Sequence, residues 1–140
     1  MAIAFVGGDT NGGNSDAPSI THGLTISSGD VIQVYLHWND AVTALNAPDE
    51  SWDSTFVSKG PAGHSHSYAI YTTFAGASEP ASYGFNLAGT EQWTVGIRQY
   101  SGGDATFWDT EPSSATMNTG NSNTTVVGNN INVTASAMGV

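Results

Sequence analysis

Short runs in which apolar and polar residues alternate recur along most of the chain. The clearest is 31–38 (VIQVYLHW), in which Ile32, Val34, Leu36 and Trp38 occupy every second position. Side chains of a strand point alternately to its two faces, so this run predicts a strand with one wholly apolar face. The intervening residues are mixed in character, which is typical of a strand in a sheet that packs against a second sheet.

Similar runs are separated by segments rich in Gly, Pro, Asn, Asp and Ser, and strong helix formers are scarce. A loop is expected at 9–18 (DTNGGNSDAP), because glycine and asparagine favour turns. The pattern predicts an all-β fold, an antiparallel β-sandwich of jelly-roll or Greek-key type with about seven to nine short strands. The strands expected before the C-terminal segment are 3–5, 20–26, 31–38, 55–59, 67–74, 83–87 and 93–100.

The C-terminal segment differs from the rest. From about residue 113 it consists mainly of Ser, Thr, Asn and Gly. Val126-Val127 and Ile131 to Val133 flank Gly128-Asn129-Asn130, which is a hairpin signal. The segment therefore predicts either a hairpin, which could also serve as an arm between subunits, or a loosely ordered terminus. With 140 residues, the chain is expected to form one domain, 1–140.

The charge balance excludes some partners. Twelve carboxylates face only two basic residues, Lys59 and Arg98, and the formal net charge is -10. Nucleic-acid affinity depends on Lys and Arg contacts to phosphate, so neither nucleic acid nor an anionic membrane is an expected partner. The chain has no Cys and no apolar run long enough to cross a bilayer.

Two groups of residues could bind a metal ion. His64 and His66 are two apart, so in a strand they share a face. They could hold Zn²⁺ with a carboxylate, form a pH-sensitive contact, or simply be exposed. Asp49, Glu50 and Asp53 form an acidic stretch that could take Ca²⁺ or be a solvated loop. No metal-binding, phosphate-binding or catalytic motif supports a site, so no catalytic residue, cofactor or metal is expected.

Two tryptophans lie outside the alternating runs, Trp52 and Trp108. Each could stack on a sugar ring or fill a pocket of a partner, and each could instead cap one end of the core. Both are therefore candidate contact residues, together with His64 and His66.

Three segments resemble small β-sandwich domains of tailed-bacteriophage virion proteins, a group that includes capsid decoration (cement) proteins and tail or fibre proteins. They are Ser28-Gly29-Asp30 leading into 31–38, the run 67–85 (SYAIYTTFAGASEPASYGF), and 93–104 (WTVGIRQYSGGD). The most distinctive part is 76–83 (GASEPASY), and the likeness covers roughly residues 3 to 104. The resemblance brings no catalytic residues with it.

The resemblance implies a non-enzymatic structural protein of the virion. Its most concrete form is a capsid decoration protein that binds the major capsid protein and itself, with a homotrimer suiting three-fold positions of a shell. The alternative is a tail or fibre domain that binds a receptor or carbohydrate, in which Trp52 and Trp108 would contact a glycan. Catalysis is not expected, because no constellation of residues supports it.

Overall fold

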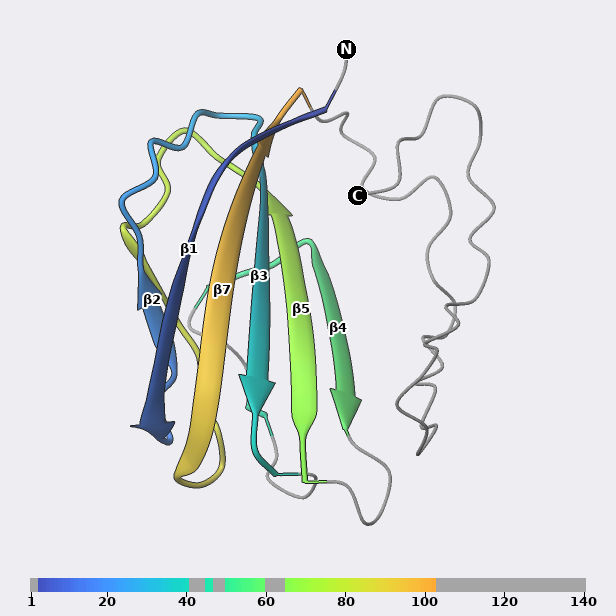
Figure 1. The fold of residues 1–140 in the computed structure, drawn as a ribbon. Coiled ribbons are helices and arrows are strands. Elements are labelled where there is room, and N and C mark those ends of the chain that lie inside the picture. The colour runs from blue at the N-terminus through green and yellow to red at the C-terminus, as the bar shows by residue number, and fades with distance from the viewer. Residues whose placement is uncertain (1–2, 41–44, 47–49, 60–64, 103–140) are drawn as a thin grey trace, which may run out of the picture. The chain divides into compact units, whose positions relative to one another are not determined.

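The computed structural model describes residues 3–40, 45–46, 50–59 and 65–102 (Figure 1). These residues belong to one compact unit, Met1–Ala105, and form seven strands and no helix. The described residues therefore contain no helix long and apolar enough to cross a membrane. The strands are β1 (Ala4–Ser15), β2 (Ser19–Thr21), β3 (Val31–Trp38), β4 (Ser54–Lys59), β5 (Ser67–Phe74), β6 (Ser82–Gly84) and β7 (Glu91–Ser101).

The strands form two antiparallel sheets. A five-stranded sheet has the order β1-β7-β3-β5-β4, and β2 pairs with β6 in a two-stranded sheet that lies behind it in Figure 1. The chain is therefore all-β, as the alternating runs predict. The predicted tail hairpin lies outside the described residues.

One apolar core lies between the two sheets. It takes alternate residues from β3, β5 and β7, and it is closed by residues of β2, β6 and the segment that follows β6. Burying each large side chain contributes about 1.5–3 kcal/mol relative to leaving it exposed. The largest fully buried apolar side chains are Trp38, Tyr71, Tyr83, Phe85, Ile20, Ile32, Leu36 and Ile97.

The expected loop at 9–18 is wrong for most of its length. β1 continues to Ser15 and pairs with β7 from Ala4 onward, with one register shift between Phe5 and Gly7. Glycine at position 8 allows the backbones of β1 and β7 to lie close together, because a Cβ on Gly8 would lie 2.7 Å from the carbonyl oxygen of Ile97. The pairing with β7 supplies backbone hydrogen bonds to a segment whose own strand propensity is low.

Two expected strands are shorter than predicted. The run 20–26 forms a strand only to Thr21, and the run 83–87 only to Gly84. Beyond these points the backbone bonds to loops, because Phe85 N–H donates to the Pro18 carbonyl and Leu87 N–H to that of Asp16. Side-chain burial continues past the strand end, which is why alternation overestimates strand length.

A buried polar pair ties β7 to the turn before β3. The amide nitrogen of Gln99 donates to an Asp30 carboxylate oxygen at 2.6 Å and to the Thr25 carbonyl at 2.9 Å. The same Asp30 oxygen accepts the backbone N–H of Ser27 at 2.9 Å. These hydrogen bonds satisfy the buried polar groups at this end of the core, and they join the C-terminal end of β7 to the start of β3.

Candidate binding face

The outer face of the five-stranded sheet is the face turned away from β2 and β6. Directly paired residues of antiparallel strands share a face, so the registers place alternate residues of each strand there. Its described side chains include Phe5 of β1, Gln33, Tyr35 and His37 of β3, Tyr68 and Ile70 of β5, and Thr94, Arg98 and Tyr100 of β7.

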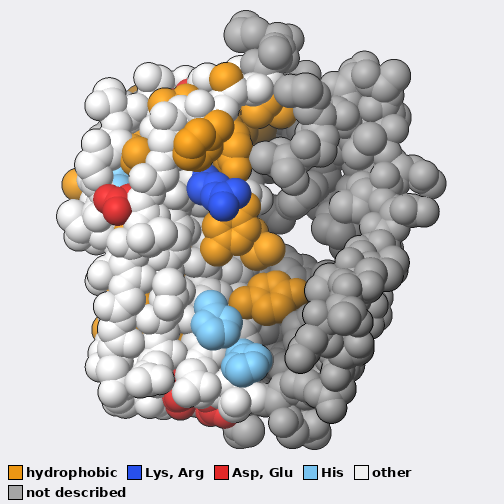
Figure 2. Space-filling model, viewed as in Figure 1, with side chains coloured by type: hydrophobic (Ala, Val, Ile, Leu, Met, Phe, Trp, Pro, Cys, Tyr) orange, Lys and Arg blue, Asp and Glu red, His pale blue; other side chains and the backbone are white. Residues whose placement is uncertain are grey.

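This face has an unusual charge for the chain it belongs to. The chain has twelve carboxylates, yet none stands at an outer-face position of β1, β3, β5 or β7. Figure 2 views this face: a cationic side chain lies among hydrophobic ones near its centre, histidines lie below, and acidic side chains appear only at the margins. The outer face is thus poor in acidic side chains, although the chain as a whole is strongly acidic.

Arg98 is held on this face by tyrosines. Its guanidinium carbon lies 5.4 Å from the ring centroid of Tyr35, which is a cation–π distance. Its guanidinium also hydrogen-bonds Tyr100, and this bond together with the two nearby tyrosines raises the pKa of Arg98. The hydroxyl of Tyr35 donates to the side-chain oxygen of Gln33. Burial raises the pKa of Tyr35. Near neutral pH, Tyr35 is therefore uncharged and Arg98 is positively charged.

An exposed aromatic side chain extends the face toward the N-terminus. Phe5 is 63% exposed and meets Tyr100 edge to face, with ring centroids 5.8 Å apart. Exposed apolar groups of this size are enriched at contact surfaces.

His66 reaches the outer face, but its neighbour is His37 of β3. The two imidazole centroids are 5.8 Å apart, and His37 pairs with Tyr68 in the register of β3 and β5. Partial desolvation and, secondly, the nearby His66 lower the pKa of His37. His64 lies outside the described residues, so its proposed pairing with His66 stays a prediction.

Trp52 packs against the core. Its ring centroid lies 5.3 Å from that of Tyr71, 5.2 Å from that of Tyr83 and 6.1 Å from that of Phe85. This is the arrangement that the core-capping interpretation expects. A ligand contact by Trp52 stays a prediction, and Trp108 lies outside the described residues.

The described part of the acidic stretch has a structural use. One carboxylate oxygen of Asp53 accepts hydrogen bonds from the Thr73 hydroxyl at 2.8 Å and the Phe74 N–H at 2.9 Å. Within the described residues, no group of three or more His, Cys, Asp or Glu side chains could hold a metal ion. Asp49 lies outside them, and the calcium and zinc hypotheses rest on sequence alone.

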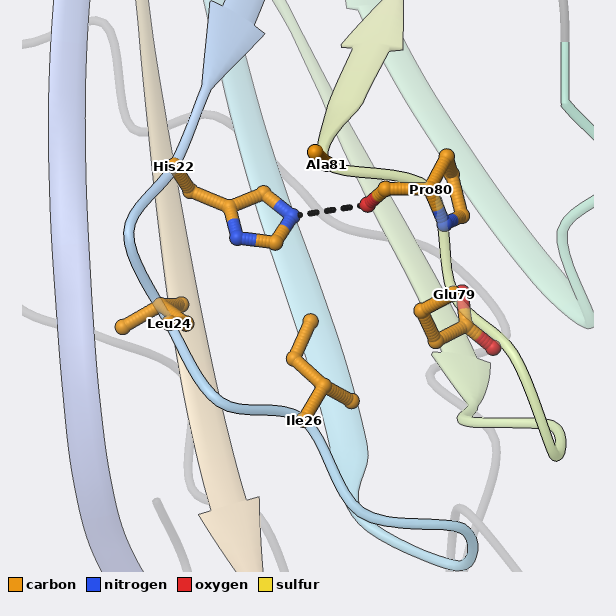
Figure 3. Close-up of a pocket in the computed structure, with 6 residues that line it drawn as sticks. All are labelled: His22, Leu24, Ile26, Glu79, Pro80 and Ala81. Atoms are coloured by element: carbon orange, nitrogen blue, oxygen red, sulfur yellow. Dashed lines mark hydrogen bonds between the residues drawn. The ribbon is translucent and has the colours of Figure 1, made fainter.

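A small hollow lies on the other side of the molecule, between the segment after β2 and the loop before β6 (Figure 3). Its volume is about 150 Å³, below the roughly 300–1,000 Å³ of most small-molecule sites. His22 Nε2 donates to the Pro80 carbonyl at 3.0 Å, while its Nδ1 is buried without a partner. The hollow is lined by His22, Leu24, Ile26, Glu79, Pro80 and Ala81.

Sequence reasoning missed Arg98, Tyr35 and His37 as candidate contact residues. Alternation does place them opposite the apolar face of their strands. Only the pairing of β3 with β7 brings Arg98 over Tyr35, and that pairing joins segments about sixty residues apart in the chain.

Comparisons with protein-family models, with curated proteins and with solved structures gave no match.

Proposed function

We propose that this chain is a non-enzymatic structural protein of a bacteriophage particle, a capsid decoration protein that attaches to the major capsid protein through its outer face. The observation that carries the proposal is this face: a sheet surface with aromatic, histidine and arginine side chains and no carboxylate at its described positions on β1, β3, β5 and β7. The resemblance of 28–38, 67–85 and 93–104 to virion β-sandwich domains supports the assignment to a particle.

The dimensions of the face suit attachment to a large partner. Five strands are about 24 Å across, and the eight residues of β3 are about 26 Å long. That area approaches the roughly 800 Å² that each partner contributes to a stable protein interface. A sheet that is already formed in the free chain loses less conformational entropy on docking than a disordered segment would, which reduces one part of the cost of association.

The finer fold assignment belongs to the same proposal. We assign the two sheets to a jelly-roll or Greek-key β-sandwich, since β7, the last described strand, pairs with both β1 and β3. A homotrimer at three-fold positions of the shell would repeat the outer face around each axis. Size-exclusion chromatography with light scattering tests the trimer: a monomer at micromolar concentration would contradict it.

The carbohydrate-binding alternative gains no comparable support. It uses Trp52 and Trp108 as a sugar platform, and the ring of Trp52 is engaged with Tyr71, Tyr83 and Phe85. The glycan hypothesis is therefore an outcome for the experiments to detect rather than a second proposal.

The test adds the purified chain to phage particles that lack it, made by deleting the gene for this chain from the phage that encodes it. A decoration protein co-sediments with heads saturably and raises the temperature at which they release DNA. Sedimentation with isolated tails alone, or with neither, would overturn the capsid assignment. A glycan array probed with the same protein identifies the alternative.

A further inference from the structure

We infer that the surface bound by the outer face is a carboxylate-bearing protein surface, and that Arg98 forms the central ion pair with it. This inference rests on the proposed function and deepens it, because it names the chemistry of the partner. Three features carry it: the distribution of charge over the fold, the way Arg98 is held, and the apolar groups around it.

The distribution of charge points to an acidic partner. A chain with formal charge -10 repels anionic surfaces wherever its carboxylates are exposed. On the outer face this repulsion is reduced, since the carboxylate of β1, Asp9, lies on the opposite side of the sheet, paired with Ile97. Arg98, one of the two basic residues of the chain, lies on this face opposite Gln33 of β3. An acidic partner therefore meets a cation on this face and no carboxylate at the described positions of β1, β3, β5 and β7.

Arg98 is presented for binding. Its side chain is exposed. It contacts the ring of Tyr35 and hydrogen-bonds Tyr100, and neither neighbour neutralises its positive charge. A guanidinium has five N–H donors in a planar fork that matches a carboxylate in two parallel hydrogen bonds. The contacts with Tyr35 and Tyr100 restrict the side chain of Arg98, so less rotamer entropy is lost when a carboxylate binds.

The surroundings of Arg98 favour a protein over an acidic glycan. Phe5, Tyr35, Tyr68 and Ile70 give the face apolar area on both sides of the cation. Such area is buried usefully by apolar side chains of a protein, and it lowers the local dielectric around the ion pair. A polyuronate chain would meet the cation but leave most of this apolar area unused.

A second copy of this chain is not the occupant, because its outer face has no carboxylate at the described positions of β1, β3, β5 and β7 to pair with Arg98. A homotrimer would then form through the sheet edges or the C-terminal segment, which leaves the outer face available to the capsid protein.

The test uses the ¹⁵N-labelled chain, 14.5 kDa per subunit, followed by NMR. It is titrated with a soluble synthetic peptide that alternates Glu with Leu and Tyr, and in parallel with the same peptide carrying Gln for every Glu. We expect shift changes for the Glu peptide that cluster on Gln33, Tyr35, Thr94 and Arg98, and weaker binding of the Gln peptide by roughly 10- to 100-fold. Arg98→Ala should weaken binding of the Glu peptide to a similar extent, while Arg98→Lys should lose only part of it.

A matched control separates the position of Arg98 from the overall charge. Thr21→Asp in β2 lowers the net charge by one, as Arg98→Ala does, but on the exposed side of the two-stranded sheet. It should bind the Glu peptide nearly as well as the wild type. Equal binding of both peptides, shift changes centred on β2 and β6, or equal loss in Thr21→Asp would overturn the inference.

Failure of this inference is distinguishable from failure of the proposed function. If the chain decorates heads and Arg98→Ala decorates them equally well, the function stands and the acidic partner is wrong. If the Glu peptide binds as expected but heads are not bound, the partner chemistry stands and the capsid assignment fails. Binding of a polyuronate in place of the Glu peptide would show that the partner is a glycan.

Discussion

Replacing Tyr71 with Phe should stabilise the protein. The side chain of Tyr71 is fully buried (0% exposed), and its hydroxyl has no hydrogen-bond partner in the structure. Burying an unpaired hydroxyl costs about 1–3 kcal/mol by mutational measurements. The rings around it, Trp52 and Phe85, stay in contact after the oxygen is removed, so Tyr71→Phe should raise the free energy of unfolding by about 1 kcal/mol.

The matched control removes the same atom from a neighbouring tyrosine. The hydroxyl of Tyr83 donates to a carboxylate oxygen of Glu79 at 2.8 Å, so Tyr83→Phe loses a charge-assisted bond. We expect the free energy of unfolding to fall by about 1–2 kcal/mol. Two chemically identical substitutions in one aromatic cluster should therefore have opposite signs.

The difference between Tyr71→Phe and the wild type should grow at alkaline pH. Burial raises the pKa of Tyr71 from 10.0 to about 12. Between these values the unfolded chain loses the Tyr71 proton before the folded chain does, so stability falls as the pH rises. At about pH 11 this adds about 1.4 kcal/mol to the advantage of the variant, which cannot ionise there.

Urea unfolding followed by tryptophan fluorescence at pH 8 and pH 11 measures all three quantities. Trp38 is fully buried and reports loss of the core. Destabilisation by Tyr71→Phe of more than about 1 kcal/mol at pH 8 would show that its hydroxyl is bonded in solution, and would refute the reasoning.

Two further outcomes follow from the packing and from the histidines. Gly8→Ala should lower the free energy of unfolding by about 1–3 kcal/mol, because the new Cβ would lie 2.7 Å from the backbone oxygen of Ile97. The control Gly23→Ala has open space around its Cβ and should change the free energy of unfolding by less than about 0.5 kcal/mol. Equal effects of the two substitutions in chemical denaturation would contradict this. The lowered pKa of His37 contributes stability that is complete above its ordinary value of 6.5 and is lost as the pH falls below it. His37→Gln should reduce the loss measured between pH 7.5 and pH 5.5, and an unchanged loss would show that other groups cause it.

The central strands could be predicted from the sequence because their environment is uniform. β3 has the bounds predicted by the alternation of 31–38, since every second residue enters the same core. Only the start of β1, at 3–5, is predicted from the sequence; its continuation to Ser15 could not be predicted, because Gly-rich segments have low strand propensity and the pairing with β7 is non-local. The sequence contains no local signal for that pairing.

The residues of the candidate face could be predicted from the sequence only in part. Alternation places Tyr35, His37, Arg98 and Tyr100 opposite the apolar faces of their strands, so an outward set can be read from the chain. Which of them meet depends on register: His37 lies beside His66 because β3 pairs with β5, and Arg98 lies over Tyr35 because β3 pairs with β7. The absence of carboxylates becomes visible only when the strands are placed side by side.

The central claim is that the outer face of the five-stranded sheet is the attachment surface. Cryo-electron microscopy of phage heads decorated with the purified chain tests it most directly. The account predicts density for the chain on the capsid surface, with β3 and β7 facing the shell and Arg98 within hydrogen-bonding distance of a capsid carboxylate. Bound chains that instead turn β2 and β6 toward the shell, and leave Arg98 in solvent, would contradict it.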